Sequence, residues 1–257
     1  QQRARLRALF YLYRLLVEKT GADRPKVPVL MMRWLLEQRS SFRSRSVWRS
    51  DKVAFIDGRY FWRPDIPGFA TRSFRRYLEN EIDRDFFPKA AYGAPVMHLS
   101  LTARSPMYYK GVPGRVYEEA ADPLSRADLI RIVQRYQNSG TSVIVLGGGE
   151  PLMRLEDIYA ILEAARPGTD FWIDTTGFSL TDDKALKLKT LGLTGITIRL
   201  NHYHEEECDD FRDYPTASTG PSGRRLPLTG PDWRRLWPTT RLPVLPMPTT
   251  WKVIWNW

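Results

Sequence analysis

The chain has 257 residues, of which 42% are hydrophobic, enough for one or two domains with a substantial core. Its 39 lysines and arginines outnumber 29 acidic residues, and the resulting charge of +10 favours nucleic acid, anionic membranes or acidic ligands as partners. No apolar run reaches the roughly 18 residues of a membrane span, and no secretory pattern is seen, so a soluble cytoplasmic protein is expected. The single Cys208 excludes an intrachain disulfide and a metal site of cysteines alone.

The first part of the chain, residues 1–93, is predicted to be an accessory region of helices and a β-hairpin. Over residues 3–18, apolar side chains recur at helical spacing with arginines on the other face. Such a helix can dock on a core or lie on a membrane surface, and the sequence leaves both open. Asp57-Gly58 joins two β-rich runs and predicts a hairpin, which a further helix over residues 73–85 follows.

A second helix is predicted over residues 29–38, and an arginine-rich segment follows it. Residues 39–49 interleave arginines with Phe42 and Trp48. Arginines can contact phosphates while aromatic rings stack on bases, so one interpretation is an RNA-binding segment. The other is a solvated loop.

After Pro95 the pattern changes to alternating strands and helices. Alternation at this spacing is typical of βαβ units around a parallel sheet, so we predict an α/β fold with about four such units in residues 94–212. Functional residues are then expected just beyond the carboxyl ends of the strands. The strands are predicted over residues 96–102, 142–146, 171–174 and 195–200, and the helices over residues 125–138, 155–165 and 181–191.

Residues 213–257 form a tail rich in Pro, Arg and Trp that is predicted to be irregular. Prolines recur through it, and only Asp213 and Asp232 are acidic. Proline interrupts helices and central strands, so the βα pattern does not continue. Two explanations stay open: a peripheral extension, or an altered reading frame that replaced the sequence after Arg212. The nucleotide sequence would separate them.

The turn after the second predicted βα strand is rich in glycine. It reads Gly147-Gly-Gly-Glu150-Pro151-Leu152. Small residues at a strand end let a ligand approach the backbone, and Glu150 offers a carboxylate to a cationic group. The turn lacks the spacing of a dinucleotide fingerprint and the ending of a phosphate loop.

Three motifs follow one another at the strand ends: Gly148-Gly149-Glu150-Pro151, then Asp174-Thr-Thr-Gly177, then Ile196-Thr-Ile-Arg-Leu-Asn201. In this order they resemble the motifs of radical S-adenosylmethionine (SAM) enzymes over roughly residues 95–212. The resemblance implies a partial TIM-like (β/α) barrel and SAM as cofactor. The first motif resembles the one that holds the SAM amino group. The residues implied for cofactor binding are Gly148, Gly149, Glu150, Pro151, Thr176 and Arg199.

The resemblance fails at the loop that holds the [4Fe–4S] cluster in that family. There the first strand ends in Cys-x3-Cys-x2-Cys, whereas this chain has Ser105, Tyr109 and Val112 at the three positions. Hydroxyls are poor substitutes for thiolates, valine cannot ligate, and Cys208 supplies one thiolate at most. We therefore expect no cluster at these positions, so the parent activity, reductive cleavage of SAM, is not expected of the chain as written.

A weaker metal-site candidate follows the last predicted strand of the barrel. His202 and His204 stand close to the acidic residues 205–207 and to Cys208. These types can ligate zinc, but an acidic solvated loop has the same composition. No base is recognisable for Cys208 as a nucleophile, and a surface thiol is the simpler interpretation.

Two functions from different classes stay open. One is a cluster-less radical SAM variant, engineered or decayed, that is a pseudoenzyme as written. The other is a natural non-catalytic module that binds a nucleotide, RNA or a protein on a degenerate barrel. Near relatives with cysteine at positions 105, 109 and 112 would favour the first.

Overall fold

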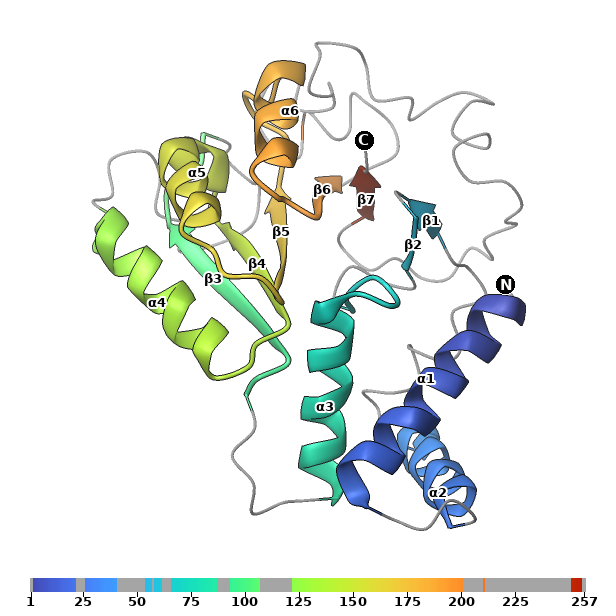
Figure 1. The fold of residues 1–257 in the computed structure, drawn as a ribbon. Coiled ribbons are helices and arrows are strands. Elements are labelled where there is room, and N and C mark those ends of the chain that lie inside the picture. The colour runs from blue at the N-terminus through green and yellow to red at the C-terminus, as the bar shows by residue number, and fades with distance from the viewer. Residues whose placement is uncertain are drawn as a thin grey trace, which may run out of the picture. The chain divides into compact units, whose positions relative to one another are not determined.

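A computed structural model describes residues 2–21, 26–40, 54–56, 58–61, 66–86, 93–106, 122–200, 210 and 251–255. It confirms the α/β class: a sheet with parallel strands alternates with helices from residue 96 onward, as a partial barrel of the expected type requires (Figure 1). No described helix is long and apolar enough to cross a membrane.

The N-terminal elements follow the sequence prediction closely. The helices are α1 (Gln2–Thr20), α2 (Val27–Ser40) and α3 (Arg72–Phe86). Strands β1 (Ala54–Ile56) and β2 (Arg59–Phe61) pair antiparallel, with Ile56 opposite Arg59. Gly58 has φ +77°, a conformation that the tight turn requires and glycine adopts without strain. The described part of the hairpin therefore agrees with the prediction.

Two compact units divide the chain, and the first contains Gln1–Met97, Gln134–Ile144 and Arg166–Asp170. In it, one apolar cluster joins α1 and α3, with Leu12, Leu16 and Ile82 almost fully buried. The rings of Phe69 and Phe74 meet edge to face at 5.4 Å. The apolar face of α1 is thus docked on a core, as one of the two interpretations of this basic helix expected.

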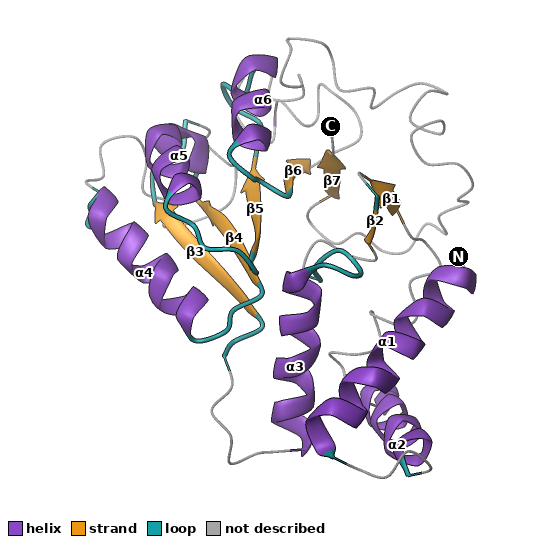
Figure 2. Ribbon diagram, viewed as in Figure 1, coloured by secondary structure: helices purple, strands orange, loops and turns teal. Residues whose placement is uncertain are grey.

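Strands and helices alternate in the remaining elements (Figure 2). Their order in the sheet is β3-β4-β5-β6-β7; β5 pairs parallel with β6, and β7 pairs antiparallel with β6. The bounds are β3 (Val96–Thr102), α4 (Arg126–Asn138), β4 (Val143–Gly148), a 3-10 helix (Pro151–Arg154), α5 (Leu155–Glu163), β5 (Asp170–Thr175), α6 (Asp182–Thr190), β6 (Gly195–Leu200) and β7 (Trp251–Trp255).

Local sequence explains where the helices begin. The Ser125 hydroxyl accepts from the Asp128 amide while the Asp128 carboxylate accepts from the Ser125 amide, so the two residues form a capping box. Thr181 caps α6 by accepting from the Lys184 amide. Strand β4 is buried from Val143 to Leu146, as expected of an inner parallel strand.

Strand β7 was not predicted from the sequence. It lies in the segment 213–257, which was predicted to be irregular, and its Ile254 pairs with Thr197 of β6. The rest of that segment lies outside the described residues. The predicted domain boundaries after residues 93 and 212 stay predictions.

Candidate functional site

The residues singled out at the strand ends belong to the second unit, which contains His98–Val133, Val145–Ala165 and Phe171–Trp257. The Glu150 side chain is 0% exposed and turns into the protein. Oε1 accepts from the Leu152 amide at 3.1 Å and from the Thr175 hydroxyl. Oε2 accepts from the Thr176 amide at 2.9 Å and from the Thr176 hydroxyl. Both carboxylate oxygens are therefore saturated by the protein itself.

The hydrogen bonds of Glu150 link the turn after β4 to the end of β5. Thr175 is the last residue of β5, Thr176 follows it, and both are buried. Pro151, the first residue of the 3-10 helix, lies just after Glu150, whose side chain caps that helix through the Leu152 amide. Glu150 thus joins two neighbouring strand ends, a role that the sequence pattern alone did not indicate.

The glycines of the turn are needed for close backbone packing. A Cβ on Gly149 would lie 2.0 Å from the Arg104 carbonyl oxygen, and one on Gly148 would lie 2.3 Å from that of Thr102. Gly148 also has φ +119°. The amides of Gly149 and Glu150 donate to these same carbonyls at 2.8 Å. A ligand was expected to approach the backbone of this turn closely. In the structure the loop that follows β3 packs against it instead.

Arg199 lies at the same edge and contacts the carbonyl side of the turn. Its Nη2 donates to the Gly149 carbonyl at 3.2 Å and to the Asp174 carbonyl at 3.4 Å. Its Nε forms an ion pair with Asp174 Oδ1 at 3.3 Å. Of the six residues implied for cofactor binding, the structure thus joins Glu150 to Thr176 and Gly149 to Arg199. Their predicted contacts with a cofactor stay predictions.

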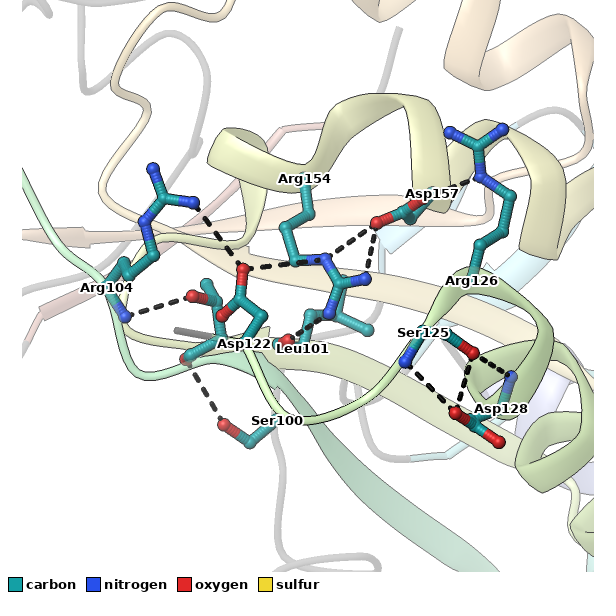
Figure 3. A network of polar contacts seen from close by, with 10 residues as sticks. Ser100, Leu101, Arg104, Asp122, Ser125, Arg126, Asp128, Arg154 and Asp157 are labelled. Carbon is teal, nitrogen blue, oxygen red and sulfur yellow. Dashed lines mark hydrogen bonds and ion pairs between the residues drawn. The ribbon is translucent and has the colours of Figure 1, made fainter. Parts of the chain in front are cut away.

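An arginine–carboxylate network supports the loop after β3 (Figure 3). Arg154, with 9% of its side chain exposed, donates to the Leu101 carbonyl at 2.9 Å and pairs with Asp157 at 2.6 Å. Asp122 lies 3.6 Å from Arg104 and 3.8 Å from Arg154. Arg104, just after β3, and Asp122, shortly before α4, therefore meet in one ion network.

Asp157 is held by arginines on two sides. Burial alone raises its pKa, but hydrogen bonds from Arg126 and Arg154 outweigh burial and leave that pKa below its ordinary value. The sequence does not single out these residues, because charged positions on separate elements carry no local pattern. The spacing of Arg154 and Asp157 at i and i+3 was the one available signal.

The former cluster positions do not offer a donor set for [4Fe–4S]. Ser105 is buried, 3% exposed, and Tyr109 and Val112 lie outside the described residues. None of the three supplies a thiolate. Within the described residues there is no group of three His, Cys, Asp or Glu that could hold a metal. The candidate at His202, His204 and Cys208 falls in a part of the chain that the structure does not describe.

Comparison with known proteins agrees with the resemblance. Residues 98–220 match the family model of the Radical SAM superfamily. A GTP 3′,8-cyclase from Synechococcus sp. (strain CC9902) is 34% identical over 120 residues, 43% of this chain and 34% of that protein. An AdoMet-dependent heme synthase from Methanosarcina barkeri (strain Fusaro / DSM 804) is 29% identical over 101 residues, 38% of this chain and 28% of that protein. The chain thus spans about a third of the length of these relatives.

Proposed function

We propose that this chain, whose residues 98–220 match the family model of the Radical SAM superfamily, binds SAM at the carboxyl ends of β4, β5 and β6 without cleaving it reductively. The observation that carries the proposal is the acceptor cluster after β4. There the Gly149 carbonyl and the Asp174 carboxylate contact a cation, the guanidinium of Arg199. The amino group of SAM is a cation of the kind that such acceptors bind.

In our proposal, five of the six implied residues shape the turn itself. Gly148 and Gly149 hold the turn against residues 102–104, while Glu150, Pro151 and Thr176 fix its shape from inside. These roles are ones of positioning, so in our proposal the ligand contacts backbone oxygens rather than the Glu150 carboxylate. Such an arrangement is pre-organised and costs little to order on binding.

The proposal omits radical chemistry because of the chemistry of the three former ligand positions. A family cluster needs three cysteines, which leave one iron free for SAM; this chain has Ser, Tyr and Val at those places and one cysteine in all. The activities named for the two relatives belong to proteins that this chain covers by 34% and 28%, so we assign neither to it.

Anaerobic reconstitution with iron and sulfide tests the proposal, together with equilibrium dialysis of radiolabelled SAM. We expect SAM to bind, with no stoichiometric iron and no change in the electron paramagnetic resonance spectrum when SAM is added. A near-stoichiometric [4Fe–4S] signal perturbed by SAM would overturn the non-cleaving part. Absence of SAM binding would overturn the proposal and favour the non-catalytic module for a nucleotide, RNA or a protein.

A further inference from the structure

Three acceptors converge on one guanidinium at the edge of the sheet. They are the carbonyl of Gly149, the carbonyl of Asp174 and the Oδ1 atom of Asp174, at 3.2, 3.4 and 3.3 Å from Arg199 nitrogens. The acceptors come from the ends of β4 and β5, and Arg199 comes from β6. Parallel strand order brings these ends together, although the residues are distant in sequence.

The chemistry of the acceptors selects a cation. The amides of Gly149 and Glu150 are already engaged with the loop after β3, so the turn presents oxygen and no amide donor from these two residues. The Glu150 carboxylate accepts four hydrogen bonds from Leu152, Thr175 and Thr176 and contributes nothing to this cluster. Two carbonyls and one carboxylate therefore form an acceptor-only seat suited to an ammonium or guanidinium group.

Arg199 is partly buried, with 20% of its side chain exposed, and Asp174 is similar at 22%. The contacting atoms Nε and Oδ1 are themselves buried, so this pair is screened less than a surface pair. A cation that binds the same three acceptors must displace the guanidinium.

We propose that Gly149 and Asp174 form an ammonium-binding seat and that Arg199 occupies it from within the chain, so that Arg199 sets the affinity for ligands carrying a cationic amino group. This inference rests on the proposed function, because SAM is the ligand that supplies the group. Arg199 is then an internal competitor of the SAM amino group, and ligands that lack this group are not excluded by it.

The test compares SAM with 5′-deoxy-5′-methylthioadenosine, which keeps the adenosine part and lacks the amino acid part. Binding of each is measured by isothermal titration calorimetry to the full chain and to R199A. We expect R199A to bind SAM about tenfold more tightly, the scale of one charge-assisted hydrogen bond. Methylthioadenosine should bind both proteins equally. R131A, which removes an exposed arginine of α4, is the matched control for net charge and should match the unmodified chain.

A second experiment asks whether another cation can bind the acceptors that R199A leaves without Arg199. In R199A, methylguanidinium should compete with SAM and leave methylthioadenosine binding unchanged. R199Q serves as a second variant if R199A fails to fold, which a thermal melt reveals, and it should behave in the same direction.

The outcomes separate the two proposals. Unchanged or weaker SAM binding in R199A, with methylthioadenosine still bound, would overturn the internal competitor and leave the proposed function standing. Binding of neither nucleoside by any variant would overturn the proposed function and, with it, this inference.

Discussion

Among the described residues, each of the two units contains a buried carboxylate whose hydrogen-bond donors are neutral, and the two carboxylates differ in the number of these donors. Glu150 in the second unit is 0% exposed and accepts two bonds at each oxygen. Asp170 in the first unit is 4% exposed and accepts from the Ser73 hydroxyl at 2.6 Å and the Gly68 amide at 3.3 Å. Within the described part of the chain, Glu150 accepts four hydrogen bonds and Asp170 accepts two.

The difference shows how the number of donors decides what a buried acid does. Burial raises the pKa of Asp170, and the bonds from Ser73 and Gly68 with the charge of Arg59 only partly offset it. The Glu150 side chain instead ties together two strand ends through four donors. A saturated carboxylate at a strand end is a structural brace, although its sequence motif suggested a ligand contact.

Replacing Glu150 by alanine should have the largest effect. E150A leaves the hydroxyls of Thr175 and Thr176 and two backbone amides buried without their acceptor. Each orphaned donor costs about 1–3 kcal/mol, and because they relax together we expect a total loss of about 4 kcal/mol in the free energy of unfolding. Urea denaturation followed by circular dichroism measures it.

The exposed Glu163 at the end of α5 provides the control, and E163A should change stability by less than about 0.5 kcal/mol. A loss below about 1 kcal/mol in E150A would contradict the brace. It would mean that Glu150 is free to turn toward a ligand, as the motif first suggested.

Asp157 adds a third carboxylate to the comparison with Glu150 and Asp170, because its hydrogen-bond donors are charged arginines. D157N removes the negative charge and one of the two acceptor oxygens that Arg154 and Arg126 share, and we expect a loss of about 2 kcal/mol at pH 7. Since the pKa of Asp157 is lowered in the folded state, this stability is present above the unfolded pKa of about 3.9 and disappears as pH falls through the folded value. The gap between the unmodified chain and D157N should therefore close in acid.

Unfolding curves at several pH values between 3 and 7 measure that gap, with E156Q on the same helix as the control. A gap that stays constant into acid would show that packing around Arg154, rather than the charge pair, sets the stability.

Much of the fold could be predicted because its signals are local. The capping box at Ser125, the cap at Thr181 and the buried run of β4 each depend on a few neighbouring residues. Strand β7 could not be predicted because its stability comes from pairing with β6, more than 50 positions earlier, within a proline-rich segment.

The positions of the candidate residues at the strand ends could be predicted, whereas their contacts could not, and their binding of a cofactor stays a prediction. The strand-end motif located Glu150, Thr176 and Arg199 at one edge of the sheet. Which atoms meet depends on strand order: Glu150 turned toward Thr176, and Arg199 turned onto the Gly149 carbonyl. Sequence patterns give residue types at strand ends, whereas the partners of each polar atom follow from tertiary packing.

Asp170 should give the smallest effect and the opposite dependence on pH. Because its folded pKa is raised, the stability contributed by its proton is fully present below the unfolded pKa of about 3.9 and is lost as pH rises through the folded value. D170N cannot titrate and keeps an oxygen for the Ser73 hydroxyl, so we expect a change of about 1 kcal/mol. The stability of the unmodified chain relative to D170N should fall with rising pH, whereas relative to D157N it rises.

S73A removes the donor that opposes the effect of burial on the pKa of Asp170, and it should move the Asp170 transition to higher pH. A difference that does not vary with pH would show that the Asp170 carboxyl has the same pKa folded and unfolded, and the contrast with Glu150 would then rest on donor count alone.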